Sequence, residues 1–405
     1  MTDSIEPESK TQLPEAACFS KNGRKRILVI VDSYLPGFRA GGPIRSVSNM
    51  VETFRQEYDF FIVTRNHDWM DNIPYSEVAH DQWLRTSDAR IYYGSDLSIT
   101  RLRKLIAEVS PQAIYLNSHF SPLSRGVLWL RRTGQIRDAS VLLAPRGEFS
   151  PGALAIKASR KFVYLKLARL LNLYEGVIWH ASTEKEREQI REQMGKVSIR
   201  VARMLSSSDA GNRHHDAVRP KKVPGNAAFV FLSRVDRMKN LDLALKMLSK
   251  LNASVTFDIY GPVGQDGYWE ECRALIAEMD ANVTCRYHGP VPQSEVAATL
   301  SRYHYLLLPT RGENFGHVIL ESLQVGTPVI ISTETPWKDL QEKGIGWDLP
   351  VNEAERWQHA LNQCVQTSGD DFLAMSLRAT EFALAYTQSD EIRRENQELL
   401  KAIGI

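Results

Sequence analysis

Residues 311–330 read Arg311-Gly-Glu-Asn-Phe-Gly-His-Val-Ile-Leu-Glu-Ser-Leu-Gln-Val-Gly-Thr-Pro-Val-Ile330. An apolar run at residues 305–309 predicts a strand before this stretch, and a helix is expected to begin near Phe315. Glu313 would then lie at the mouth of the helix and Glu321 two turns inside, on nearly the same face. The free N–H groups of the first turn and the helix dipole favour a bound phosphate. Since carboxylates accept strong hydrogen bonds from hydroxyls, the segment predicts a site for a nucleotide sugar.

This pattern resembles the donor-site signature of the retaining GT-B glycosyltransferases of glycosyltransferase family 4, also called glycosyl transferases group 1. The resemblance lies in Glu-x7-Glu after an apolar strand, followed by Gly326-Thr-Pro-Val-Ile330. An ordinary exposed helix with two solvated glutamates is the alternative, which the strand and the Gly-Thr-Pro turn disfavour. The resemblance covers residues 26–400. It implies an α/β fold in which two Rossmann-like, doubly wound parallel-sheet domains face a central cleft.

The length of 405 residues exceeds what one compact core accommodates, so two domains are expected. An apolar content of 43% and a charged content of 24% are typical of a soluble globular protein. No run of 18 uncharged apolar residues is present, which argues against a membrane span. Residues 1–25 are polar and lack the apolar region of a secretory signal, so they are expected to form a disordered leader.

The cysteines and acidic motifs favour a cytoplasmic protein without a bound metal. The four cysteines are scattered without Cys-x-x-Cys spacing, which indicates a reducing compartment and argues against structural zinc. No Asp-x-Asp is present, which disfavours glycosyl transfer through a protein-bound divalent metal. We therefore expect no metal site and no cofactor beyond the donor substrate.

The net charge of +2 hides an asymmetry between the two halves. Residues 24–205 hold 28 Lys and Arg against 18 Asp and Glu, a net charge of +10. The rest of the chain therefore holds 22 against 30, a net charge of −8. This contrast favours an anionic partner for the first half. We expect peripheral contact with an anionic membrane on its cytoplasmic face, and no contact with nucleic acid.

Both halves alternate apolar runs with helical segments, which is typical of parallel doubly wound sheets. We expect an acceptor-side domain at residues 26–205, a linker at 206–226 and a donor domain at 227–385. The resemblance further implies that residues 386–405 form a helix that crosses back onto the first domain. The expected strands are residues 27–31, 60–64, 113–116, 141–144 and 177–180 in the first half, and 229–233, 256–260, 284–287, 305–309 and 329–332 in the second.

Two further segments carry candidate phosphate-binding groups. Gly41 and Gly42 follow the first strand, where adjacent glycines let backbone amides approach a phosphate without an intervening Cβ. Arg234 and Lys239 lie five positions apart across a turn, so both could face one anion. The resemblance assigns the donor diphosphate to these four residues.

The remaining candidates come from the resemblance and from strand ends. His119 follows the third strand of the first half and matches a family histidine near the donor sugar, whereas a lone histidine there is otherwise structural. Arg146 either contacts the acceptor or pairs with Glu148. The other donor-binding candidates are Gly261, Val291, Asn314, Phe315 and Gly316. Family members often carry Pro-Asn-Gly where this chain has Val201-Ala-Arg-Met-Leu205, so the interdomain hinge is expected to differ.

These residues together predict a retaining, metal-independent hexosyltransferase. UDP- or GDP-sugars are the expected donors, and a saccharide or lipid-linked saccharide in bacterial-type surface polysaccharide or glycolipid assembly is the expected acceptor. Glu313, His119, Arg234 and Lys239 are the candidate catalytic residues, and Glu321 is expected to orient the ribose. Two alternatives stay open, a nucleotide-sugar epimerase and a non-catalytic membrane-surface protein of this fold. The chain lacks the Gly-x-Gly-x-x-Gly that a dinucleotide-dependent enzyme would need after its first strand.

Overall fold

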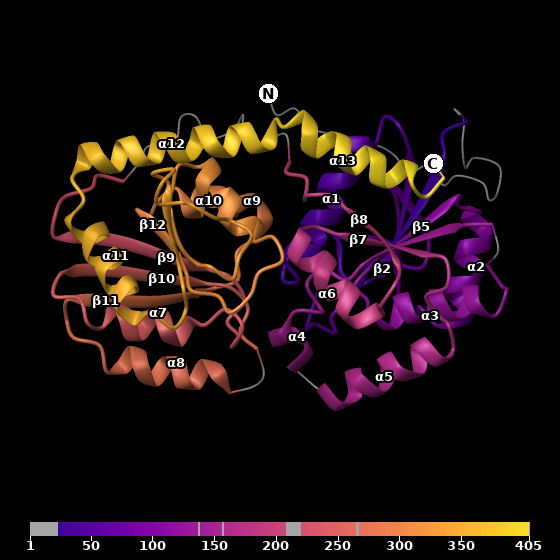
Figure 1. Cartoon of the computed structure of the whole chain (residues 1–405), viewed down its shortest axis with the longest axis horizontal. Helices are drawn as coiled ribbons and strands as arrows, with labels where there is room; N and C mark the ends of the chain where they lie inside the picture. Colours follow the sequence, from indigo (N-terminus) through magenta and orange to yellow (C-terminus); the bar gives the residue numbers. More distant parts are fainter. Residues whose placement is uncertain (1–22, 137, 156–157, 208–219, 265–266, 405) are drawn as a thin grey trace, which may run out of the picture.

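Two α/β domains lie side by side in the computed structural model of this chain (Figure 1). The structure describes residues 23–136, 138–155, 158–207, 220–264 and 267–404. Most of the expected leader and of the expected linker, residues 1–22 and 208–219, therefore lies outside the described residues.

The N-terminal domain is built on an eight-stranded sheet of order β3-β4-β2-β1-β5-β6-β7-β8, in which β3 alone runs antiparallel to its neighbour. Its central strands are continuous apolar runs, as expected for a parallel sheet covered on both faces. Helices α2 and α3 pack on one face, and α1 packs on the other. The strands are β1 Arg26–Ile30, β2 Asp59–Arg65, β3 Trp83–Arg85, β4 Arg90–Gly94, β5 Ala113–Asn117, β6 Ser140–Ala144, β7 Val177–Ala181 and β8 Ser198–Val201; the helices are α1 Gly42–Phe54, α2 Ile99–Val109, α3 Pro122–Arg132, α4 Pro151–Ala155, α5 Ala158–Leu170 and α6 Glu184–Met194.

The C-terminal domain has a six-stranded parallel sheet of order β11-β10-β9-β12-β13-β14. Successive strands are added on one side of β9 as far as β11 and on its other side from β12 onward. The boundary between β9 and β12 is therefore a topological switch point, where open α/β sheets bind ligands at their carboxyl edge. Its strands are β9 Asn226–Leu232, β10 Ser254–Tyr260, β11 Val283–Gly289, β12 Tyr305–Leu308, β13 Val329–Ser332 and β14 Gly346–Leu349; its helices are α7 Leu241–Leu248, α8 Tyr268–Ala277, α9 Gln293–Leu300, α10 His317–Gln324, α11 Ala354–Gln366 and α12 Gly369–Thr387.

The last helix, α13 (Asp390–Lys401), lies on the N-terminal domain, whereas α12 runs along the C-terminal domain (Figure 1). Ile392, Leu399 and Leu400 of α13 are buried in the same apolar cluster as β1 and α1. The chain thus returns to its first domain and ties the two domains together at one edge.

The hinge at residues 202–205 is held by side chains from four different elements. Each of its four backbone carbonyls accepts a hydrogen bond from a side chain, so the segment has few unsatisfied groups despite its irregular conformation. The four bonds are His180 to Ala202 at 2.9 Å, Asn396 to Arg203 at 2.8 Å, Tyr386 to Met204 at 3.0 Å and Asn49 to Leu205 at 2.8 Å.

The predicted fold class is confirmed, and all ten expected strands are present within three residues of their expected bounds. Four strands were not predicted, namely β3, β4, β8 and β14. The helix expected to begin near Phe315 begins instead at His317, because Gly316 takes a left-handed conformation at φ 77°.

Candidate active site

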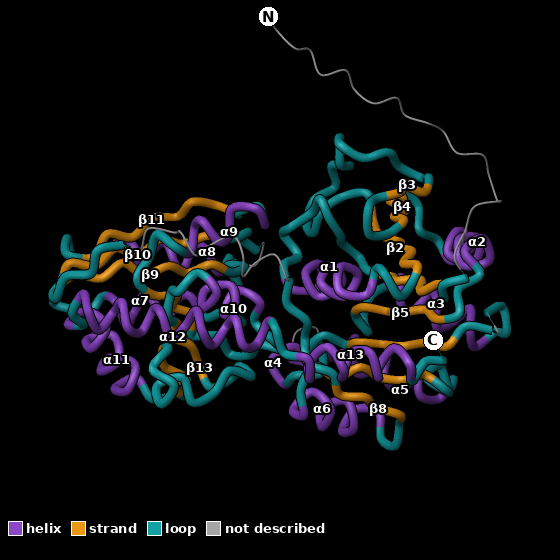
Figure 2. The backbone as a smooth tube through the Cα atoms, turned by 90° about the horizontal axis from the view of Figure 1, so that it is seen from above, coloured by secondary structure: helices purple, strands orange, loops and turns teal. Residues whose placement is uncertain are grey.

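A cleft of about 520 Å³ lies between the two domains. It is bounded by α1 of the N-terminal domain and by α9 and α10 of the C-terminal domain, which face each other in Figure 2. Gly41, Arg45, His317 and Glu321 are among its lining residues. Its volume falls within the range of small-molecule sites, which is roughly 300–1,000 Å³.

The N-termini of α1 and α10 meet at this cleft. Gly41 precedes α1 at φ 66°, a conformation that favours glycine, and the helix starts with Gly42. A Cβ on Gly42 would lie 3.7 Å from the His317 ring, so the two helices approach within ordinary contact distance. Since both helices direct their unpaired N–H groups toward this junction, the local field favours an anion.

Glu313 lies just before α10, at the mouth of the helix as expected from the sequence. It lies in the loop before the helix, where its N–H donates to the carbonyl of Glu334 at 2.9 Å. Its carboxylate is ion-paired with Lys239, and the two side chains are only 15% and 9% exposed. The alternative of two solvated glutamates on a surface helix is therefore wrong for this residue.

Arg234 and Lys239 follow the same strand but contact different groups in the structure. Arg234 lies 5.1 Å from the ring of Trp69 in the N-terminal domain and 3.5 Å from the carboxylate of Asp236. Lys239 instead reaches Glu313. The Arg234 side chain thus reaches the N-terminal domain, whereas the Lys239 side chain is paired within the C-terminal domain.

Glu321 is ion-paired across the domain boundary with Arg45 of α1. The Gln293 amide also donates to its carboxylate at 3.3 Å. Arg45 was not among the residues singled out from the sequence, although it lies in the first turn after the Gly41-Gly42 pair. A cation one turn inside a glycine-rich helix start is the signal that could have identified it.

His119 does not line the cleft, so its expected position next to the donor sugar is corrected. Its side chain is fully buried, with Nε2 2.7 Å from the Tyr174 hydroxyl and the ring packed against Phe149 and Trp179. Burial lowers the pKa of His119 to about 3, so the imidazole is neutral at physiological pH. It acts as a core residue behind the carboxyl edge of β5.

The histidine at the cleft is His317, the first residue of α10. Ser46 donates its hydroxyl proton to the Gly42 carbonyl at 2.9 Å, so its oxygen accepts the Nε2–H of His317 at 3.0 Å. Burial, together with the positive charges of Arg45 and Arg146, holds the pKa of His317 well below its usual value. His317 is therefore neutral and joins the two helix starts by a hydrogen bond.

Arg146 is fixed by the ends of the N-terminal strands, in a left-handed backbone conformation at φ 55°. Its guanidinium donates to the Tyr115 hydroxyl at 2.7 Å and to the Asn117 side chain at 2.8 Å. It does not pair with Glu148, whose carboxylate accepts the His119 N–H at 2.6 Å. Of the two expected roles for Arg146, the pairing with Glu148 is therefore wrong.

The other candidates are not among the lining residues of the cleft in the described part of the chain, and they make backbone and packing contacts. A Cβ on Gly261 would lie 1.8 Å from the Ser233 carbonyl oxygen, so only glycine fits there. Asn314 packs against Gly147, whose added Cβ would come within 3.0 Å of it. Phe315 is buried and contacts Trp337, and Val291 packs partly buried against the C-terminal core.

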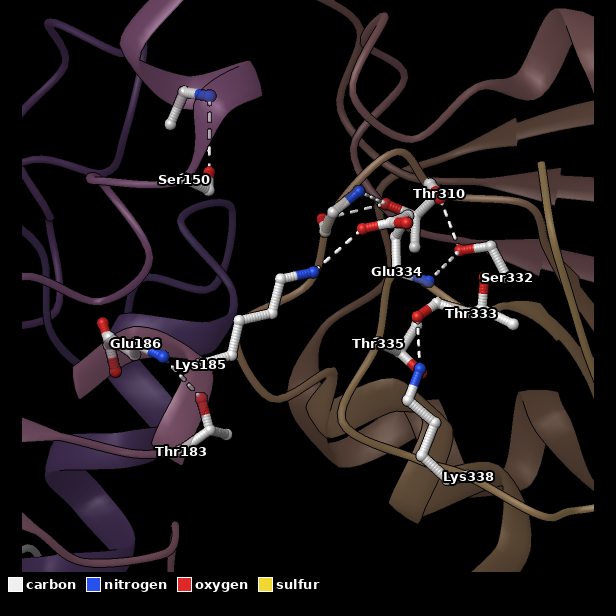
Figure 3. A network of polar contacts seen from close by, with 12 residues as sticks. Ser150, Thr183, Lys185, Glu186, Thr310, Ser332, Thr333, Glu334, Thr335 and Lys338 are labelled. Carbon is white, nitrogen blue, oxygen red and sulfur yellow. Dashed lines mark hydrogen bonds and ion pairs between the residues drawn. The ribbon is translucent and has the colours of Figure 1, made fainter. Parts of the chain in front are cut away.

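A second ionic contact joins the domains on the Glu313 side, where Figure 3 shows Lys185 extending across the gap to Glu334. The two groups are 2.9 Å apart. The Glu334 carbonyl accepts the N–H of Glu313, so this interdomain contact adjoins the loop that carries the first acidic candidate. Within the described residues, no group of three or more His, Cys, Asp or Glu could hold a metal ion.

Part of this chain is similar in sequence to known glycosyltransferases. Residues 214–375 match the family described as "Glycosyl transferases group 1". D-inositol 3-phosphate glycosyltransferase of Jonesia denitrificans is 25% identical over 189 residues, which cover 45% of this chain. The match spans 44% of that protein's length.

Solved structures of similar shape cover nearly the whole chain. Sucrose-phosphate synthase from Thermosynechococcus elongatus has a TM-score of 0.68 at 17% identity and covers 94% of this chain and 99% of its own. HepE of Anabaena, in complex with UDP and glucose, has a TM-score of 0.67 at 14% identity, with coverage of 94% and 100%. At these identities the likeness concerns the fold, and the architecture is GT-B.

Proposed function

We propose that this chain is a glycosyltransferase that moves a hexosyl group from a nucleoside diphosphate sugar to an acceptor hydroxyl, with retention and without a protein-bound metal. The observation that carries the proposal is the meeting of two helix N-termini at an interdomain cleft of a GT-B fold, where Arg45 and Glu321 line the cleft. A second ion pair, between Lys239 and Glu313, involves the loop that leads into α10. The family match over residues 214–375 supports glycosyl transfer. UDP or GDP is the proposed carrier, and HepE is solved with UDP.

Each charged group has a role in this proposal. The helix starts and Arg234 and Lys239 would neutralise the diphosphate as the bond from the sugar C1 to its oxygen breaks. That oxygen keeps the electron pair of the broken bond. The acceptor oxygen would form the new bond on the same face of the sugar, and its proton would pass to the leaving phosphate. Glu313 would orient the sugar, Glu321 the ribose, and Arg146 would lie on the acceptor side.

A binding screen followed by a transfer assay tests this proposal. The protein is expected to show a higher melting temperature with UDP or GDP than with the matched nucleoside monophosphate or with buffer, because a ligand of the native state stabilises it. Incubation with the corresponding nucleotide sugar and saccharide acceptors should then release nucleoside diphosphate. An epimerase would isomerise the sugar without releasing nucleotide, and a non-catalytic protein would do neither, so both outcomes would contradict the proposal.

We also propose that α5 brings the enzyme to an anionic membrane at the cytoplasmic face, where a lipid-linked saccharide acceptor in surface polysaccharide or glycolipid assembly would be reached. The inner face of α5 buries Leu165 and Ala168, yet its outer face also exposes apolar residues. An ordinary surface helix has a polar outer face, so this second apolar face requires a partner. The exposed residues are Phe162, Val163, Leu167 and Leu170, with Leu171 just beyond the helix.

The charges around this face favour anionic lipid. Arg160, Lys166 and Arg169 are exposed on α5, and residues 149–174 contain no Asp or Glu. Each such cation contributes about 1 kcal/mol near an anionic membrane surface. Lys161 is turned inward onto the Ala153 carbonyl, and Lys157 lies outside the described residues. Among the described helices, none is long and apolar enough to cross a membrane.

Liposome co-sedimentation tests this surface. Binding is expected to rise with phosphatidylserine content and fall with salt, and the change Leu167→Asp with Leu170→Asp should reduce it several-fold. Leu377→Asp on α12 is the matched control, because that leucine is equally exposed but belongs to the other domain. Equal binding by all three proteins, or binding that ignores lipid charge, would overturn the proposal.

A further inference from the structure

Arg45 is a cation of the N-terminal domain that reaches a carboxylate of the C-terminal domain. It lies in the first turn of α1, and its side chain and that of Glu321 are only 16% and 17% exposed. Buried ion pairs are stabilising only where their remaining polar atoms are also hydrogen-bonded. Whether this ion pair stabilises the protein therefore depends on the other polar groups around Arg45 and Glu321.

The pair is incompletely satisfied in the described structure. The second carboxylate oxygen of Glu321, Oε2, is buried without a hydrogen-bond partner, and only the long bond from Gln293 supplements the first. Burial of the Arg45 guanidinium lowers its pKa to about 9, which reflects the same shortage of solvation. Both groups line the 520 Å³ cleft, so a ligand can reach them.

The surroundings of Arg45 favour an anion from a ligand. The starts of α1 and α10 direct their free N–H groups to this junction, and His317 between them is neutral and adds no charge. Glu321 is the carboxylate that offsets Arg45 here. A ligand that brings hydroxyls to Glu321 and phosphates to Arg45 would satisfy both groups and fill the missing hydrogen bond.

We propose that Arg45 is a donor-binding residue supplied by the N-terminal domain, which holds Glu321 while the cleft is empty and moves onto the diphosphate when the ribose hydroxyls replace it there. This inference rests on the proposed function. Since the two residues belong to different domains, the exchange keeps the domains connected in both states. It also requires both halves of the ligand, because a nucleoside alone would leave Arg45 buried without an anion.

Loss of Arg45 should therefore affect the binding of a nucleoside and the binding of its diphosphate differently. In Arg45→Gln, the affinity for the nucleoside diphosphate is expected to fall about tenfold or more, as for loss of a charged hydrogen bond. The affinity for the nucleoside should stay the same or rise, because the Glu321 carboxylate no longer has an ion pair with Arg45 to break before it binds the ribose. A residue with a merely structural role would lower both affinities together.

The experiment is calorimetric titration of uridine, UDP, guanosine and GDP into the wild-type protein, Arg45→Gln and Arg45→Lys. Arg356→Gln is the matched control, because Arg356 forms an exposed pair with Glu353 on α11, in the other domain. If Arg45→Gln lacks cooperative thermal unfolding, Arg45→Lys replaces it, and its diphosphate affinity should be intermediate between wild type and no binding.

The possible results separate this inference from the proposed function. Parallel loss of nucleoside and diphosphate affinity, or wild-type affinity for both in the variants, would overturn the role of Arg45 while leaving the proposed function intact. A wild-type protein that binds no nucleotide would overturn both.

Discussion

Lys239→Ala and Arg234→Ala are each expected to lower turnover by about 10²- to 10³-fold, because each removes a cation proposed to stabilise the departing diphosphate. Their effects on stability should differ. Lys239 and Glu313 are largely buried together, so removing Lys239 leaves a carboxylate without its cation and should cost about 1–3 kcal/mol. Arg234 is more exposed and lies on the Trp69 ring, so its loss should change the melting temperature little.

Steady-state kinetics and thermal unfolding of the two variants check these expectations. Arg237→Gln is the control, because Arg237 lies in the same loop but is paired with Glu271 at the surface, where both side chains are 55% exposed. Lys239→Arg should recover part of the activity by restoring the charge. A normal rate in either alanine variant would show that the diphosphate is held elsewhere. An equal loss in Arg237→Gln would mean that the net charge of the loop matters rather than its two proposed contacts.

The sequence predicted the sheets well where strands are continuous apolar runs. β1 and β12 are examples, because a parallel strand covered on both faces is apolar along nearly all of its length. β8 and β3 were not predicted because they are short and carry polar or half-exposed residues near the sheet margin. In such strands, hydrogen bonding to a neighbour decides the conformation more than local composition does.

The sequence indicated where candidate residues lie along the chain, but not which groups they contact. His119 was placed correctly at the end of β5, but side chains from distant elements, such as Tyr174 and Trp179, draw its ring into the core. The partnership of Arg45 with Glu321 depends on the packing of one domain against the other. No local pattern encodes such a contact, since the two residues are far apart in the chain.

Replacing Glu321 by glutamine should weaken nucleotide binding, whereas replacing Glu313 by glutamine should lower turnover. If Glu321 holds the ribose, Glu321→Gln keeps one acceptor oxygen but loses the charge. Binding of nucleoside diphosphate and of nucleotide sugar should then weaken alike, by about 1–2 kcal/mol. Because Arg45 would also lose its partner in the empty cleft, the melting temperature of the ligand-free protein should fall as well.

Glu313→Gln should leave binding of the bare nucleoside diphosphate nearly unchanged while it lowers turnover. Glu313 lies in the loop before α10, beside Asn314, where the sugar rather than the ribose is proposed to bind. Its contact would be strongest when the sugar carries developing positive charge. Loss of Glu313 should therefore raise the free energy of the transition state more than that of the bound ground state. Glutamine can still accept a hydrogen bond from Lys239, which keeps that side chain in place.

Calorimetric affinity and steady-state turnover for both variants decide between these roles. Glu381→Gln, an exposed carboxylate on α12, is the control and should behave as the wild type. Equal losses of nucleotide affinity in Glu313→Gln and Glu321→Gln would overturn the assignment of sugar and ribose. If the two glutamates were solvated, neither variant would lose nucleotide affinity or turnover. Both side chains are, however, more than 80% shielded from solvent by ion pairs and packing. Unchanged affinity and unchanged turnover in both variants would therefore mean that the donor binds outside this cleft.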